Sequence, residues 1–102
     1  MSNGVIIKGG NARRVDLKTG GDRGSVGTSG AVDAASDGNF IVIVYRDGRA
    51  RRYDALHGSD RGSVGASGVT GCAISGGVIL LNYGGQRARR YDARTGGDRG
   101  SV

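Results

Sequence analysis

The stretch Ala50-Arg51-Arg52-Tyr53-Asp54, followed six residues later by Asp60-Arg61-Gly62-Ser63-Val64, decides the fold because it is repeated. Further copies begin at Ala12 and Ala88, and both halves of the motif recur with a constant spacing of 38 residues. A fixed period between about 20 and 50 residues is typical of repeat architectures. We therefore interpret the chain one repeat at a time.

The middle copy contains four short segments separated by turn residues. The run Phe40–Tyr45 consists of apolar or aromatic residues, mostly β-branched, between turns that contain glycine. This pattern predicts a central strand that is covered on both faces. Three further strands are predicted at 31–36, 50–55 and 60–64. After the third strand, the flanking copies carry the pattern D-x-x-T-G, in which side-chain oxygens accept from turn amides and glycine adopts a positive φ.

The other two copies follow the same plan. The third copy predicts strands at 69–74, 78–83, 87–93 and 98–102. The first copy begins with the strand at 5–7 and lacks an equivalent of the segment at 31–36, so the chain is predicted to hold eleven strands. We interpret it as one repeat domain, 1–102, with a partial blade at 1–26 and blades at 31–64 and 69–102.

Four antiparallel strands in about 40 residues predict an all-β fold of β-propeller blades, each a four-stranded meander. The apolar strand that ends in tyrosine and the pattern D-G-R-x-R-x-Y-D-x-x-T-G resemble the second and third strands of WD40-like blades, with Tyr-Asp in place of Trp-Asp. The first strand of each blade is expected to lie near the central axis, where only small side chains fit. Such residues are Ala34, Ala35, Gly71, Cys72 and Ala73.

The number of repeats predicts assembly. Propellers usually close with four to eight blades, and an open arc exposes two apolar sheet faces. A chain with fewer than three full repeats is therefore expected to complete a ring with copies of itself, using two or three chains joined head to tail. The chain also resembles short repeat reading frames of bacteriophage genomes. That resemblance implies a structural protein of a virion or tail. A chain made in the cytoplasm is expected separately, because no signal-peptide pattern is seen.

Arginine accounts for most of the formal charge of +6, and each repeat also carries aspartates at constant positions. Two interpretations stay open. In the first, one arginine of each pair points towards an aspartate of a neighbouring blade; this inter-blade set comprises Arg14, Asp16, Asp22, Arg52, Asp54, Asp60, Arg90, Asp92 and Asp98. In the second, a basic face binds nucleic acid or an acidic glycan, and the contacts are Arg13, Arg51 and Arg89.

The sequence contains no set of residues that we expect to act together in catalysis. His57 is the single histidine and replaces a turn threonine, whereas Cys72 lies among small residues of a predicted inner strand. The segment Gly20-Gly21-Asp22-Arg23-Gly24 lacks the Gly-Lys-Ser/Thr ending of a phosphate loop. We therefore predict a non-enzymatic interaction protein with no cofactor, no metal and no membrane partner. No apolar run is long enough for a signal peptide or a membrane span, so a soluble chain is expected.

Overall fold

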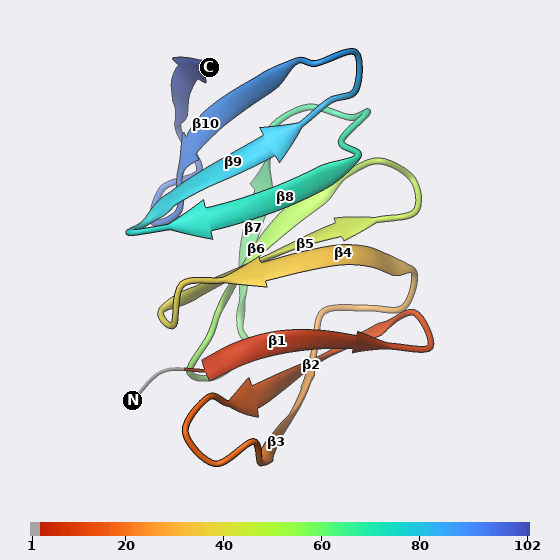
Figure 1. Ribbon diagram of the computed structural model, residues 1–102, viewed down its shortest axis with the longest axis vertical. Coiled ribbons are helices and arrows are strands. Elements are labelled where there is room, and N and C mark those ends of the chain that lie inside the picture. Colours follow the sequence, from red (N-terminus) through yellow and green to blue (C-terminus); the bar gives the residue numbers. More distant parts are fainter. Residues whose placement is uncertain (1–2) are drawn as a thin grey trace.

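The structure is a computed structural model that describes residues 3–102, and these residues form eleven β-strands and no helix. The chain folds into three antiparallel sheets, each a simple meander in sequence order (Figure 1). The first sheet contains β1 (Asn3–Lys8), β2 (Asn11–Asp16) and β3 (Asp22–Val26). The second contains β4 (Ala31–Ser36), β5 (Phe40–Tyr45), β6 (Ala50–Asp54) and β7 (Asp60–Val64). The third contains β8 (Gly71–Ser75), β9 (Val78–Asn82), β10 (Ala88–Asp92) and β11 (Asp98–Ser101).

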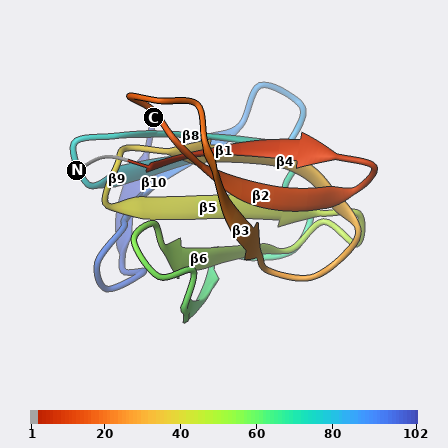
Figure 2. The ribbon, with the colours of Figure 1, turned by 90° about the horizontal axis from the view of Figure 1, so that it is seen from below.

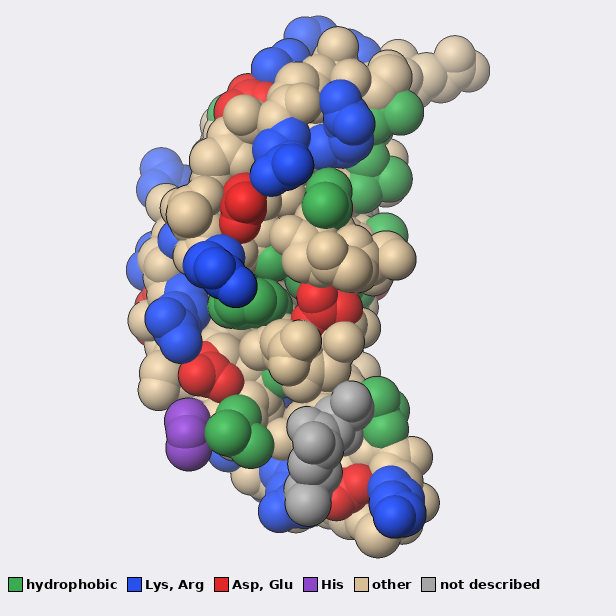
Figure 3. Space-filling view, turned by 90° about the vertical axis from the view of Figure 1, so that its left-hand side faces the viewer, with side chains coloured by type: hydrophobic (Ala, Val, Ile, Leu, Met, Phe, Trp, Pro, Cys, Tyr) green, Lys and Arg blue, Asp and Glu red, His purple; other side chains and the backbone are tan. Residues whose placement is uncertain are grey.

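The three sheets stack face to face as an arc. Strands β1, β4 and β8 lie side by side in one layer, with β5 and then β6 behind them (Figure 2). The arc is hollowed on the side of this inner layer (Figure 3). The small residues expected near an axis, from Ala34 to Ala73, therefore belong to the inner strands β4 and β8. No described segment is a helix that could cross a bilayer.

Two apolar cores fill the spaces between neighbouring sheets. Ile41 and Ile43 face the first sheet and pack against Ala12 and Val26, whereas Val42 and Val44 face the third sheet. These four side chains of β5 are completely buried, because successive strand residues point to opposite faces and both faces are covered. The predicted central strand is thus confirmed. The third-sheet side of the second core contains Ile79, Leu81, Tyr91 and Ala93.

The motif Asp-Arg-Gly-Ser-Val forms a bulged outer strand in each sheet. Between β6 and β7 the pairing shifts register, so that Arg52 lies opposite Gly62 and Tyr53 opposite Asp60. Gly62 has φ of 103°, which favours glycine, and its amide donates to Asp60 Oδ1 at 2.7 Å. Because Asp60 also accepts from Arg51, the repeated motif encodes one local structure rather than a site.

The first hairpin is one residue shorter than its equivalents, which the constant spacing of the arginine motif did not reveal. Ile7 pairs with Ala12 across the turn Gly9-Gly10, whereas Val44 pairs with Ala50 across a longer turn. Residues of β1 are therefore equivalent to those 37 positions later, not 38. A one-residue shift exchanges the two faces of a strand, and here it turns Ile6 away from the second sheet.

The strands predicted at 31–36, 40–45 and 60–64 have the observed bounds, and the other bounds differ by one or two residues. β1 begins at Asn3 instead of residue 5, and β8 begins at Gly71 instead of residue 69. The amide of Val69 donates to the carbonyl oxygen of Gly48 at 2.9 Å, so this residue is held by the preceding sheet. Val69 therefore belongs to the linker between the second and third sheets, residues 65–70, although its side chain is part of the core.

Candidate interaction surface

An arginine joins each sheet to the next one along the chain. Arg14 of β2 donates from Nη1 to the carbonyl oxygen of Leu56 at 2.6 Å. Arg52 of β6 donates from Nη1 to the carbonyl oxygens of Ala93 and Arg94 at 3.1 and 2.8 Å. Each guanidinium also donates from Nη2 to a carbonyl of its own outer strand, at 2.8 Å for Arg14 and 2.6 Å for Arg52. Arg52 is only 7% exposed, and burial lowers its pKa.

A turn glycine of the next sheet provides the space for each guanidinium. A Cβ atom built on Gly58 would lie 3.1 Å from Nε of Arg14, and one built on Gly96 would lie 3.0 Å from Cζ of Arg52. Both glycines have positive φ and end the turn that follows the third strand of the sheet. The turn therefore presents its carbonyl oxygens and a flat backbone surface to the arginine of the preceding sheet.

The structure corrects the partner that we expected for these arginines. We expected an aspartate of the neighbouring sheet, but the acceptors are backbone carbonyl oxygens. The aspartates instead form ion pairs within their own sheets, at 2.6–3.3 Å. These pairs are Arg13–Asp22, Arg51–Asp60, Arg89–Asp98, Arg23–Asp16, Arg61–Asp54 and Arg99–Asp92. The three arginines proposed as polyanion contacts, Arg13, Arg51 and Arg89, are thus each neutralised by a carboxylate.

Hydrogen bonds hold these carboxylates in the charged form. The side chain of Arg23 and the amides of Lys18 and Thr19 lower the pKa of Asp16. The side chain of Arg13 likewise lowers the pKa of Asp22, and that of Arg51 lowers the pKa of Asp60. In each case the charged carboxylate is favoured by the fold, so protonation weakens both the ion pair and the turn or bulge that depends on it.

Acid is therefore expected to destabilise the protein. A carboxylate whose pKa is lowered by folding stabilises the fold above its unfolded pKa of about 3.9, and this contribution is lost as the pH falls further. We expect the thermal midpoint followed by circular dichroism to be constant between about pH 5 and 7 and to fall below about pH 4. Added salt, which screens repulsion between the remaining cations, should not restore it. An equal midpoint at pH 3 and pH 7 would contradict the role given to the aspartates.

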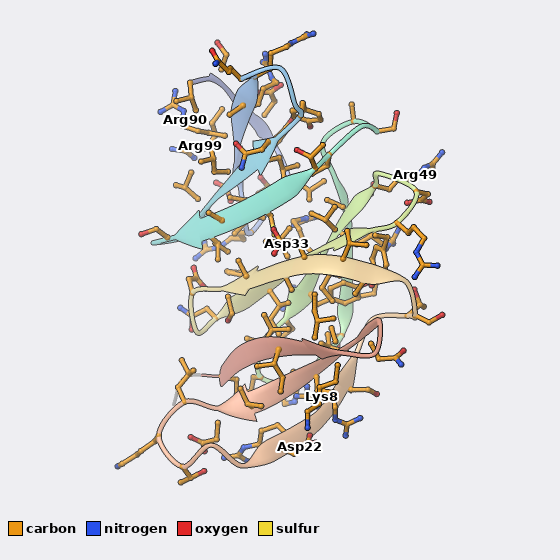
Figure 4. The ribbon with its side chains drawn as sticks, turned by 45° about the vertical axis from the view of Figure 1, so that its right-hand side comes forward. Lys8, Asp22, Asp33, Arg49, Arg90 and Arg99 are labelled. Atoms are coloured by element: carbon orange, nitrogen blue, oxygen red, sulfur yellow. The ribbon has the colours of Figure 1, made fainter. Side chains whose placement is uncertain are left out.

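Arg90 is the third member of the inter-sheet arginines, and no further sheet follows it among residues 3–102. It lies exposed beside Arg99 at the end of the stack (Figure 4). Its Nη2 donates to the carbonyl oxygen of Arg99 at 3.1 Å, as in the other two copies. Among residues 3–102, however, no carbonyl of another sheet accepts from it. We call the arginine donor of one sheet and the turn carbonyl oxygens of the next sheet, taken together, the arginine joint. At Arg90 the donor half of this joint is present without an acceptor among the described residues.

The acceptor half is found at the opposite end of the stack. In the first sheet, Leu17, Lys18 and Gly20 occupy the turn positions of Ala55, Leu56 and Gly58. Gly20 has φ of 77°, like its equivalents, but no described atom lies within 4 Å of the point where its Cβ would be. No described group donates to the carbonyl oxygens of Leu17 or Lys18. The first and last sheets therefore carry the two unmatched halves of one joint.

Both ends of the stack leave side chains less covered than their equivalents in the second sheet. We define the leading face as the outer face of the first sheet, where Ile6 is 41% and Leu17 63% exposed, although their equivalents Ile43 and Ala55 are completely buried. We define the trailing face as the outer face of the third sheet, with Leu80, Asn82 and Arg90. The equivalents of Leu80 and Asn82 in the second sheet, Val42 and Val44, are completely buried. These faces are therefore candidate interaction surfaces.

Other single candidates have structural roles. The amide of Cys72 donates to Asp33 Oδ2 at 3.0 Å, and burial raises the pKa of the thiol to about 12, with a further contribution from Asp33. A thiol with such a pKa is a poor nucleophile at neutral pH. His57 is exposed in its turn, where its amide donates to Asp54. The described residues contain no group of His, Cys, Asp or Glu side chains arranged to hold a metal ion.

Comparison with known proteins shows the fold. No protein-family model matches the chain, and no curated protein matches it in sequence. Its structure is similar to BamB from Moraxella catarrhalis, with a TM-score of 0.75 and 20% identity over 99% of this chain and 33% of that one. It is also similar to the computationally designed Ika8 protein, with a TM-score of 0.71 and 18% identity over 92% and 34% of the two chains. Hydrazine synthase from Kuenenia stuttgartiensis gives a TM-score of 0.70 and 16% identity over 91% and 29%.

The chain thus spans about a third of the length of these structures. Together with the meander topology, the similarity to BamB and to a designed propeller confirms an all-β, propeller-like fold.

Proposed function

We propose that this protein is a non-enzymatic interaction scaffold that closes a propeller ring with copies of itself. A propeller-like fold is suited to this role, because each sheet buries its faces only against neighbouring sheets. The trailing face of one copy packs on the leading face of the next. These two faces differ, so the contact is head to tail and every copy uses both faces once.

One observation carries the proposal: the two halves of the arginine joint are unmatched at opposite ends of the same chain. Arg14 and Arg52 each find carbonyl oxygens and a glycine in the following sheet. Arg90 is a donor without such a partner, and the turn that ends at Gly20 is an acceptor without a donor. Placing the first sheet of a second copy after the third sheet of the first copy satisfies both.

We call the contact between the trailing face of one copy and the leading face of the next the seam. Residues that depart from the repeat support a seam at these two faces. Asp33 and Asp37 accept from the amides of Cys72 and Gly77 at 3.0 and 2.9 Å and so hold the inner part of the next sheet. Their equivalents in the third sheet are Gly71 and Ser75, which carry no carboxylate. Since the first sheet has no strand equivalent to β4 or β8, a third sheet that docks on it needs no such acceptor.

A second departure concerns the tyrosine pair that meets each linker. Tyr45 and Tyr53 share a hydrogen bond of 2.6 Å, and Tyr45 accepts from the linker amide of Thr28. Tyr83 and Tyr91 repeat this arrangement in the third sheet. The first sheet has Lys8 and Val15 at these positions. It therefore offers no hydroxyl to a linker, which fits a neighbour that arrives from a separate chain.

The number of sheets favours two copies. Three sheets in each chain give a ring of six with two copies, within the usual range of about four to eight blades. Three copies would give nine sheets, outside that range. The resemblance to short repeat proteins of bacteriophages suggests that such a ring serves in a virion or tail, and this role stays a prediction.

The mass in solution tests the proposal. Size-exclusion chromatography with multi-angle light scattering is expected to give twice the chain mass of 10.4 kDa. The mass of a single chain at micromolar concentration would contradict closure by copies. Three times the chain mass would keep the closure and overturn the six-sheet count.

A further inference from the structure

The unpaired positive charge of the protein is concentrated along one edge. Six of the nine carboxylates are paired at 3.3 Å or less with arginines of their own sheet, which leaves nine cations and three aspartates to account for the net charge of +6. Three of these cations are the inter-sheet arginines. Four others lie at the hairpin edge, which we define as the edge formed by the β1–β2, β5–β6 and β9–β10 turns: Lys8, Arg46, Arg49 and Arg87.

Only one carboxylate lies among the turns of the hairpin edge. Asp47 is 4.0 Å from Arg49, and both side chains are largely exposed, so solvent screens this pair. Arg49 lies at the tip of the β5–β6 turn and points away from the sheets (Figure 4). Arg87, in the next turn, is exposed and has no described ion-pair partner. The edge therefore keeps a positive surplus of the kind that attracts anions.

Two equivalent grooves open at this edge, one at each junction between sheets. Groove A, of about 470 Å³, lies between the linker of the first two sheets (residues 27–30) and the β5–β6 turn. Groove B, of about 830 Å³, lies between the linker of the second and third sheets (residues 65–70) and the β9–β10 turn. Both volumes are in the range of about 300–1,000 Å³ that is typical of ligand pockets. The polar lining that the grooves share includes Ser29, Arg49 and Ser63 in groove A and Ser67, Arg87 and Ser101 in groove B. Arg51 and Arg89 also line the grooves, but each is paired with a carboxylate of its own sheet. Each groove also has one aspartate in its lining, Asp47 in groove A and Asp98 in groove B.

We infer that the two grooves bind an acidic saccharide, with Arg49 and Arg87 contacting its sulfate or carboxylate groups and the serine hydroxyls contacting its hydroxyls. Arginine matches the geometry of such anions with two parallel N–H donors. The repetition of the site on neighbouring sheets suits a polymer with anionic groups at regular intervals, because several weak sites then act together.

The grooves are less suited to nucleic acid. Single-stranded nucleic acids are held mainly by bases stacked on exposed aromatic side chains. The aromatic residues of the grooves are Tyr45, Tyr83 and Tyr91, and the hydroxyl groups of Tyr83 and Tyr91 are bonded to each other. Tyr45 and Tyr91 are 9% and 5% exposed, so their ring faces are not available for stacking.

Binding of a heparin-derived octasaccharide, measured by calorimetry at several salt concentrations, tests the inference. The double variant Arg49→Ser with Arg87→Ser is expected to weaken binding on the order of tenfold at low salt, and to lower the slope of log affinity against log salt by up to about two. Arg94→Ser, which removes an exposed cation from the opposite edge of the third sheet, serves as the control and should have little effect.

Three results would overturn the inference. They are no binding at low salt, a loss per removed charge that is equal for the control and the groove variants, and tighter binding of an oligo-dT of matched charge. Because each groove is formed within one chain, these results are independent of the assembly state. Light scattering on the same samples shows separately whether the ring forms.

Discussion

Replacing Arg90 by alanine is expected to convert the proposed oligomer into single chains. The variant loses the donor to the carbonyl oxygens of Leu17 and Lys18 of the next copy and leaves those acceptors without a partner. Hydrogen bonds from a charged donor contribute about 1.5–3 kcal/mol, and a two-copy ring contains two equal seams. The dissociation constant should therefore rise roughly a hundredfold or more. The measurement is the mass by light scattering over a dilution series.

Two further variants separate this geometry from charge. Arg94→Ala removes the same charge from the same sheet, but Arg94 is an exposed residue of the turn after β10 whose backbone carbonyl, kept in the variant, accepts from Arg52, so the mass should stay that of the proposed oligomer. Arg90→Lys keeps the charge without the planar group that fits over a glycine turn, so it should restore assembly only in part. An Arg90→Ala variant that keeps the oligomer mass at all dilutions would contradict the proposed seam.

The second large effect is expected from Leu81→Ala. Leu81 of β9 is completely buried in the core between the second and third sheets. Truncation of a buried leucine leaves a cavity and costs about 2–5 kcal/mol, a large part of the stability of about 5–15 kcal/mol of a typical domain. Urea denaturation should show a lower midpoint without a change in the slope of the unfolding free energy.

Leu80→Ala is the matched control, because Leu80 is the neighbouring residue on the same strand and points to the trailing face. It removes the same atoms from the face that we assign to the seam. The stability of the isolated chain should change little, measured in the Arg90→Ala background, in which the chain is expected to be monomeric. The dissociation constant of the otherwise normal chain should rise. Equal losses of stability in both leucine variants would mean that the trailing face is already covered within one chain.

Much of the architecture was predictable from local patterns. The β-branched run at β5 indicated a strand covered on both faces, and the repeated turn motifs separated the strands correctly to within two residues. These predictions succeed because strand formation and turn chemistry depend mainly on residues that are close in the chain. The exception is the first hairpin, where Gly9-Gly10 makes a shorter turn that shifts β1 by one residue. A constant spacing of the arginine motif carries no information about a strand that precedes it.

The partners of the arginines were not predictable in the same way. Arg51 and Arg52 are neighbours in one strand and so point to opposite faces, but nothing in their identity says which of the two faces another sheet. We expected aspartate acceptors because aspartates are visible in a sequence. The observed acceptors are backbone carbonyl oxygens, such as that of Ala93, which every residue carries and which become distinctive only when a turn directs them at a guanidinium.

The repeat and its four-strand plan follow from the order of residues alone, since they depend on pattern and spacing. Which cations are neutralised, and which face each end of the stack presents, depends instead on how the sheets pack. Arg51 has its carboxylate in its own sheet, Arg52 its carbonyls in the next, and Arg90, identical in local sequence to Arg52, has no next sheet. Identical segments differ here only in their neighbours, and neighbours are a property of three-dimensional packing.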